Sequence, residues 1–278
     1  MFTDTDKQQI EKRGMTVAQV EHQLEQIKNG FPYLRLKSTA AVGQGISALS
    51  DVEQQDAEKA WEVYKDEGHT VVKFVPASGA ASRMFKNMFA FLNADYDTPQ
   101  TDFEKKFFAD IKKFAFRKAL CDVCKKNTGK SIMQLIQAGD YKAVVRNLLM
   151  PEGLNYGQLP TGLLQFHEDE EGVRTPMEEH LVEAALYASS KGKALVHFTV
   201  SHDHLKLFEQ KVEEKKAYYE KKFNVKLEVS FSEQKPSTDT IAANPDNTPF
   251  RNEDGSLLFR PGGHGALIEN LNEINADV

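Results

Sequence analysis

The stretch VVKFVPASGAASRMFK, residues 71–86, decides the fold, because it combines a buried strand, a turn of small residues and the start of a helix near Ser82. Small residues in such a turn let backbone N–H groups approach an anion, and Arg83 offers a planar fork of donors for phosphate oxygens. An ordinary strand-to-helix turn with an exposed arginine is the alternative. The phosphate site predicted here comprises Ala77, Ser78, Gly79, Ala80, Ala81, Ser82 and Arg83.

Strands and helices alternate along the chain from this stretch onward. We expect strands at 70–75, 163–166, 194–200 and 226–232. A helix capped by Thr175 follows the second, and a charged helix from about 202 to 222 follows the third. This alternation indicates an α/β fold with a mostly parallel sheet flanked by helices.

Two helical regions stand outside this alternation. Residues 1–68 predict a helical arm, with Thr16 and Ser50 as helix caps. Residues of about 101–151 carry only helical signals and predict an insertion, whose phenylalanines are expected to form a core instead of a stacking platform. The expected domains are therefore the arm, 1–68, and an interrupted α/β domain, 69–278.

Composition excludes several classes of protein. The net charge of −6 argues against a nucleic-acid partner, although a local basic pocket could still hold a small phosphorylated ligand. No run of residues reaches the roughly 20 apolar residues of a membrane helix, and the amino terminus lacks the apolar stretch of a signal peptide. We therefore expect a cytoplasmic globular protein with no membrane partner.

Several short motifs have a plain structural interpretation as well as a chemical one. Cys121 and Cys124 are the only cysteines, and without a second ligand pair we expect them to be ordinary helix residues. The run KNTGKS, 126–131, lacks the first glycine of a phosphate-cradling loop, so a helix break at Gly129 and a new cap at Ser131 are expected. The acidic run 167–171 is expected to be a solvated turn.

His202 and His204 follow a predicted strand, where ligand-facing loops gather. Two residues that lie two positions apart on a helix diverge, and no third ligand is near in sequence, so a metal site is not expected. A substrate contact and a helix-capping role both remain open.

Four segments, in order, resemble those of sugar nucleotidyltransferases of the pyrophosphorylase branch. Gly79, Ser82 and Arg83 match the Gly-x-Gly-Thr-Arg signature, and Pro160-Thr-Gly is similar to a Pro-Lys-Gly segment. Gln234 resembles the glutamine that reads the base, and FRPGGHGAL, 259–267, resembles the paired-glycine segment that lies against base and sugar. The likeness covers about residues 70–278 and is greatest to an uncharacterised bacterial family, a domain of unknown function.

This resemblance implies a doubly wound, Rossmann-like sheet with a nucleotide across the carboxyl ends of its strands. It implies a reaction between a nucleoside triphosphate and a sugar 1-phosphate that releases pyrophosphate, with Mg²⁺ as cofactor and uridine as the base. Arg83 and Thr161 would act in catalysis. The implied nucleotide contacts are the loop residues above together with Gln234, Gly262, Gly263, His264 and Gly265.

Two positions depart from the family pattern. Ala81 replaces the second glycine of the signature, and Thr161 replaces a lysine that neutralises phosphate charge, which a hydroxyl cannot do. Either Lys86 or Lys73 substitutes for that lysine, or the chain is a non-catalytic nucleotide or sugar-phosphate binding module. A helical interaction scaffold is a third possibility. The magnesium-binding aspartate of the related enzymes would lie beyond residue 278, so we expect these residues to be the front part of a longer protein, with metal ligands unknown.

Overall fold

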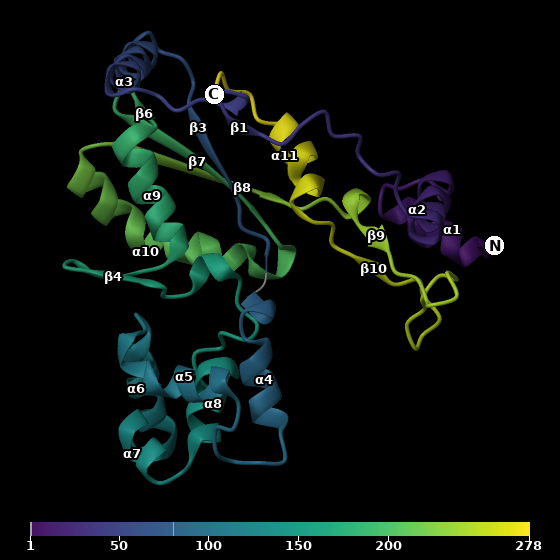
Figure 1. Ribbon diagram of the computed structural model, residues 1–278, viewed down its shortest axis with the longest axis vertical. Coiled ribbons are helices and arrows are strands. Elements are labelled where there is room, and N and C mark those ends of the chain that lie inside the picture. Colours follow the sequence, from purple (N-terminus) through teal and green to yellow (C-terminus); the bar gives the residue numbers. More distant parts are fainter. Residues whose placement is uncertain (1, 80) are drawn as a thin grey trace. The chain divides into compact units, whose positions relative to one another are not determined.

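The computed structural model describes residues 2–79 and 81–278, with only the backbone for Ser82 and His264. Contacts within the chain define two compact units, Val72–Glu233 and the combination of Met1–Val71 with Gln234–Val278. Figure 1 traces the elements of both. We call them the sheet unit and the terminal unit.

The sheet unit contains three parallel strands, with β7 between the other two. Strands β3 (Val72–Pro76) and β8 (Lys226–Glu233) both pair with β7 (Lys193–Val200), and the short β6 (Ser189–Ser190) pairs antiparallel with its first residues. The strands expected at 70–75, 194–200 and 226–232 are therefore confirmed. The fold is mixed α/β, but a doubly wound sheet is not evident in the described residues, because the sheets are small and mixed.

Helices α9 (Pro176–Tyr187) and α10 (Leu205–Phe223) pack together against this sheet. Alternate residues of β7, from Ala194 to Val200, are buried against Met177 and Leu181 of α9 and Phe208 of α10. The predicted cap is confirmed, since the Thr175 side chain accepts from the Glu178 N–H and the Glu178 carboxylate accepts from the Thr175 N–H. Because successive side chains of a strand point to opposite faces, one face of the sheet packs against these helices.

The strand expected at 163–166 is wrong. Thr161–Leu163 forms a 3₁₀ turn, and Leu164 is fully buried in the core of the neighbouring helices. Gly162 packs against the Phe208 ring, where an added Cβ would lie 3.1 Å from Cζ. The apolar run is therefore a buried turn, a case that an apolar pattern of four residues does not distinguish from a strand. The hairpin β4 (His167–Asp169) and β5 (Gly172–Arg174) follows it.

Five helices of the sheet unit share a second core, rich in phenylalanine and leucine. Ser131 caps a helix as expected, in a capping box with Gln134, and Thr101 forms a capping box with Glu104. Gly129 ends a helix in the left-handed conformation with φ of 72°. The helix break expected at Gly129 is therefore confirmed. The helices are α4 (Lys86–Asn93), α5 (Asp102–Ala109), α6 (Arg117–Thr128), α7 (Ile132–Gln137) and α8 (Tyr141–Leu149).

Both cysteines lie in α6 and are free thiols. Cys124 is fully buried, and burial raises the pKa of its thiol to about 11. Both cysteines thus lie in a helix, as expected from the sequence.

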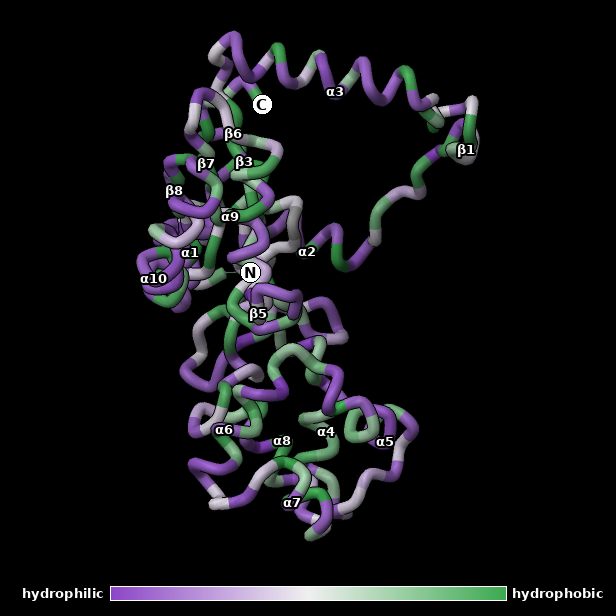
Figure 2. The backbone as a smooth tube through the Cα atoms, turned by 90° about the vertical axis from the view of Figure 1, so that its left-hand side faces the viewer, coloured by the Kyte–Doolittle hydropathy of each residue, from purple (hydrophilic) through white to green (hydrophobic). Residues whose placement is uncertain are grey.

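The terminal unit joins the two ends of the chain around a small apolar core. Thr16 and Ser50 cap helices as expected, and α3 is mainly hydrophilic along its length (Figure 2). The amino-terminal elements are α1 (Asp4–Lys12), α2 (Val17–Asn29), β1 (Ala41–Val42), β2 (Gly45–Ile46) and α3 (Asp51–Asp66). The carboxyl-terminal ones are β9 (Thr240–Ile241), β10 (Phe259–Arg260) and α11 (Ile268–Asn272).

Among residues 2–79 and 81–278, no helix combines the length and apolar character that crossing a membrane requires.

Candidate functional site

The carboxyl ends of the three parallel strands meet at one edge of the sheet. Pro76 of β3 is in register with Thr199 of β7, and Val200 is in register with Glu233 of β8. The segments that leave this edge in the sheet unit are the loop 77–83 and the turn 201–204. Ligands of parallel α/β sheets bind outside this end of the strands, so we take this edge as the candidate site.

Backbone hydrogen bonds to neighbouring segments hold the loop 77–83 in place. The Ala77 N–H donates to the Thr199 carbonyl oxygen at 2.8 Å, and the Ala81 N–H donates to the Leu159 carbonyl oxygen at 3.2 Å. Both alanines are buried. Two of the amides that the sequence assigned to phosphate binding therefore have partners inside the chain, and a phosphate would compete with these bonds to use them.

The helix expected to begin near Ser82 begins at Lys86, so that prediction is wrong. A 3₁₀ turn at Ala81–Arg83 comes first, and α4 has no side-chain cap. The physical reason is that Ala81 and Phe85 are both drawn into the helical core, which turns the chain between them. The loop is followed by a short turn instead of a helix terminus, so the anion-binding argument depends on Arg83 more than on a helix dipole.

Gly79 leaves open space beside the loop. A Cβ built at Gly79 would meet no atom within 4 Å, and the residue does not have a left-handed backbone. Neither packing within the chain nor backbone strain explains a glycine at this position. Thr161 lies next to it, since the Thr161 N–H donates to the Gly79 carbonyl oxygen at 3.2 Å and the Thr161 hydroxyl lies 3.5 Å from the same oxygen.

Arg83 is exposed, and no hydrogen bond or ion pair joins its guanidinium to the part of the chain that the structure describes. Lys86 is exposed at the start of α4. Lys73 is committed elsewhere, because its ammonium contacts the Glu183 carboxylate at 2.5 Å and the Tyr187 hydroxyl, both on α9. Lys73 therefore does not replace the missing lysine at this edge, and Arg83 and Lys86 are the cations beside the loop.

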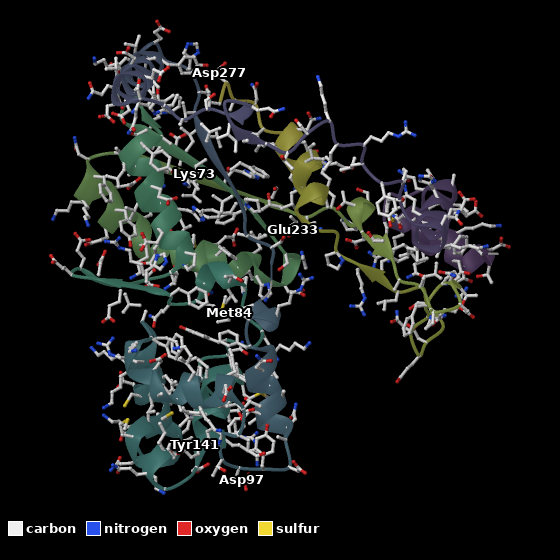
Figure 3. All side chains as sticks on the ribbon, in the orientation of Figure 1. Lys73, Met84, Asp97, Tyr141, Glu233 and Asp277 are labelled. Atoms are coloured by element: carbon white, nitrogen blue, oxygen red, sulfur yellow. The ribbon has the colours of Figure 1, made fainter. Side chains whose placement is uncertain are left out.

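The histidines of the turn 201–204 have partners at the same edge. The Ser201 hydroxyl lies 2.6 Å from His204 Nδ1, and His202 Nδ1 lies 3.0 Å from the Glu233 carboxylate. Neither histidine caps α10 with its side chain. Glu233 is labelled in Figure 3 at the carboxyl end of β8. The turn thus places two imidazoles at this edge, and the substrate-contact interpretation stays open.

The residues predicted to contact the base belong to the terminal unit, not to the sheet unit. The Gln234 side-chain amide donates to the Gly262 carbonyl oxygen at 3.0 Å. A Cβ at Gly262 would lie 2.8 Å from Ala266 Cβ, so packing requires that glycine, whereas Gly263 and Gly265 face open space. The structure brings Gln234 and Gly262 together, and separately brings Thr161 and Gly79 together. Ala80 and the side chains of Ser82 and His264 lie outside the described residues.

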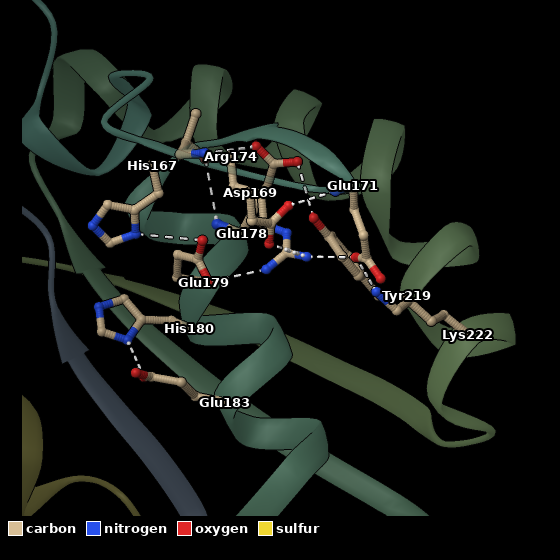
Figure 4. Close-up of polar contacts among 11 residues, drawn as sticks. His167, Asp169, Glu171, Arg174, Glu178, Glu179, His180, Glu183, Tyr219 and Lys222 are labelled. Atoms are coloured by element: carbon tan, nitrogen blue, oxygen red, sulfur yellow. Dashed lines mark hydrogen bonds and ion pairs between the residues drawn. The ribbon is translucent and has the colours of Figure 1, made fainter. Parts of the chain in front are cut away.

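Asp169 and Glu171 of the acidic run 167–171 are engaged within the chain, as Figure 4 shows. Arg174 of β5 contacts Asp169 at 2.9 Å, Glu171 at 2.5 Å and Glu179 at 3.4 Å, and His167 lies 3.4 Å from Glu179. The run forms the hairpin β4–β5, with its charges paired to a partly buried arginine. It is an ion-pair network on the surface of α9 and not a set of free metal ligands.

Magnesium would need several oxygen ligands or water-filled positions beside the phosphate oxygens. Within the described ranges, no group of three or more His, Cys, Asp or Glu side chains could hold a metal ion. At the strand-end edge, the Glu233 carboxylate is paired with His202. Magnesium therefore stays an expectation from the resemblance.

A second polar cluster lies across β7 and β8 and was missed from the sequence. His197 is buried, with Nδ1 2.8 Å from the Ser230 hydroxyl and Nε2 2.8 Å from the Ser232 hydroxyl. Burial lowers the pKa of His197 below its ordinary value. The signal was available, because His197 and Ser230 alternate with apolar residues on two strands that were expected to pair.

The fold and this edge define a small mixed α/β protein with a candidate anion-binding loop after its first parallel strand. Residues 3–278 match the family model described as a domain of unknown function, DUF4301, so the chain belongs to that family. No curated protein and no solved structure gives a significant match. Membership of an uncharacterised family is confirmed, whereas the relation to pyrophosphorylases stays a prediction.

Proposed function

We propose that the protein binds a phosphate-bearing ligand at the edge formed by β3, β7 and β8. The observation that carries the proposal is Arg83, exposed and unpaired within the described residues, on a loop where Gly79 leaves open space. A guanidinium presents several donors in a plane and binds two phosphate oxygens at once. The neighbouring Lys86 adds positive charge in a chain whose net charge is −6.

The reaction we propose joins a nucleoside triphosphate to a sugar 1-phosphate. An oxygen of the sugar phosphate attacks the α-phosphorus in line, a new P–O bond forms, and the bond to pyrophosphate breaks. Arg83 would contribute by holding phosphate oxygens and offsetting their charge, which is the main task of a protein in phosphoryl-type transfer. Magnesium, a doubly wound arrangement of the sheet and a cytoplasmic location stay predictions, and no step here depends on them.

A non-catalytic binding module is the second candidate, and Thr161 favours it. The hydroxyl of Thr161 lies against the Gly79 carbonyl oxygen where the resembling enzymes carry a lysine, and Lys73 is held by α9. Fewer cations then face the phosphates than catalysis in those enzymes requires. In this second candidate function, the protein binds the same ligand at the same site but does not catalyse the reaction.

Pyrophosphate release, measured with a panel of nucleoside triphosphates and sugar 1-phosphates, tests the catalytic proposal. We expect turnover in the native chain and a loss of about 100-fold in Arg83→Ala, the size of effect that removing one charge-stabilising donor produces. Arg35→Ala is the matched control, since Arg35 is also exposed and belongs to the terminal unit. An unchanged rate in Arg83→Ala would rule out the catalytic assignment of Arg83.

The two candidates are separated by Thr161→Lys. If the native chain is silent and the lysine variant releases pyrophosphate, the native protein is a binding module. If the native chain already turns over, it is an enzyme and the lysine is dispensable.

A further inference from the structure

An apolar cavity of about 420 Å³ opens in the sheet unit beside the loop 77–83. Its wall includes Met84, the residue that directly follows Arg83 and that Figure 3 labels where the chain leads into α4. Most of the remaining wall is aromatic and comes from Phe85, Phe103, Phe107, Phe114, Phe116 and Phe166. The expectation that these phenylalanines form a core accounts for the buried ones but not for the open space between them.

The rings that line the cavity hold one another in position. Phe114 and Phe116 stack with centroids 5.0 Å apart, and Phe107 lies 5.2 Å from Phe114. Phe107 and Phe116 are buried, so the inner wall is fixed by the packing of the helical core. A ligand would find the cavity largely formed, as is usual for small-molecule sites.

Two large apolar side chains of the wall remain open to solvent. Met84 is 51% exposed and Phe103 is 45% exposed. A single exposed apolar residue is unremarkable, but two beside one apolar cavity mark a surface that a ligand can cover. The volume lies within the range of pockets that bind small organic molecules.

The charged groups beside the cavity carry a net positive charge, which favours an anion over a cation. Lys106 and Asp110 line the cavity, and the Asp110 carboxylate is shared by Lys106 at 2.7 Å and Lys113 at 2.7 Å. Lys113 does not line the cavity and both lysines are largely exposed, so this cluster places one net positive charge beside the cavity. Arg83 directly precedes the lining residue Met84 in the chain. The wall has too few polar groups to satisfy the hydroxyls of a sugar.

We propose that this cavity binds the aromatic ring system of an anionic ligand whose phosphate group faces Arg83. The part of this proposal that concerns the phosphate group rests on the proposed function. The part that concerns the aromatic ring depends on the cavity alone. Aromatic side chains favour a flat partner through stacked and edge-to-face contacts. The ligand class is therefore an aromatic phosphate, with its ring among the phenylalanines.

Calorimetric titration with 1-naphthyl phosphate, 1-naphthol and inorganic phosphate tests both halves separately. We expect 1-naphthyl phosphate to bind most tightly of the three compounds. Phe103→Ser should weaken the binding of both naphthyl compounds about tenfold, and Phe103→Tyr should restore the binding of both. Arg83→Ala should weaken only 1-naphthyl phosphate, to the affinity of 1-naphthol. Phe250→Ser is the matched control, since Phe250 is 41% exposed and lies in the terminal unit.

Each departure from this pattern has one meaning. If neither naphthyl compound binds, or if both bind Phe103→Ser as well as the native chain, the cavity does not take the ring and the inference is wrong. If Phe103→Ser weakens both but Arg83→Ala changes neither, the cavity stands and the phosphate role of Arg83 fails. If only Arg83→Ala weakens the binding of 1-naphthyl phosphate, the phosphate role of Arg83 is supported and the aromatic site is wrong.

Discussion

The backbone N–H of Thr161 donates to the carbonyl oxygen of Gly79 at 3.2 Å. These residues are 82 positions apart in the chain, and both were singled out from the sequence through the same resemblance. Their contact shows that the turn at 161–163 supports the loop after β3.

Gly79 and Gly157 should respond differently to alanine. At Gly79 a Cβ meets nothing, so we expect Gly79→Ala to change the free energy of unfolding by less than about 0.5 kcal/mol. At Gly157 a Cβ would lie 2.5 Å from the Phe89 ring and 2.8 Å from the Leu149 carbonyl oxygen, so Gly157→Ala should cost about 2 kcal/mol. Urea unfolding measures both.

If the space beside Gly79 admits a phosphate, Gly79→Ala should also weaken nucleoside triphosphate binding about tenfold while the chain stays folded. Unchanged binding in a folded Gly79→Ala variant would remove the glycine from the site. An equal loss of stability in both variants would contradict the packing described for the loop.

Asp6 and Arg251 form a paired contact that should make stability depend on acid. Both Asp6 carboxylate oxygens accept from Arg251 at 2.8 Å, and Asp6 is 3% exposed. The hydrogen bond from Arg251 holds the pKa of Asp6 well below its usual range. Asp6→Asn should lower the free energy of unfolding by about 3 kcal/mol at pH 7, because it leaves the arginine without its partner.

The direction of the pH dependence follows from the lowered pKa of Asp6. The contribution of Asp6 is fully present above the ordinary carboxyl pKa of about 3.9 and is lost as pH falls through that value toward the folded pKa. The difference between native chain and Asp6→Asn should therefore shrink below about pH 4. Asp4→Asn, at a position 94% exposed, is the control and should show neither effect. A constant difference across this range would contradict the account.

His197 should make the protein less stable below neutral pH. Burial lowers the pKa of its imidazole, so in the unfolded chain it takes up a proton below about pH 6.5 more readily than in the folded one. The free energy of unfolding should fall between pH 7.5 and pH 5.5, and His197→Asn should flatten that fall. His180, whose pKa burial also lowers, keeps part of the slope.

Much of the local structure was predictable because it follows from short-range chemistry. Thr16, Ser50, Thr101, Ser131 and Thr175 all cap helices with the partner three residues on, as the sequence indicated. The three parallel strands were recognised by their apolar runs. These features depend on residues that are neighbours in the chain.

What failed depends on distant contacts. Leu164 is buried by helices that no local pattern reveals, so 163–166 was mistaken for a strand. The helix expected at Ser82 starts at Lys86 because Ala81 bonds to Leu159, 78 positions away. The cavity beside Met84 escaped notice because helical spacing of phenylalanines predicts burial and does not indicate where burial is incomplete.

Thermal unfolding with nucleoside triphosphates and sugar 1-phosphates tests the central claim, a phosphate ligand at the Arg83 loop, most directly. A ligand that binds only the folded chain adds about 2.7 kcal/mol at one hundred times its dissociation constant, enough to raise the midpoint visibly. We predict a rise in the native chain and in Arg35→Ala that is absent in Arg83→Ala. An equal rise in Arg83→Ala, or no rise with any of these ligands, would contradict the account.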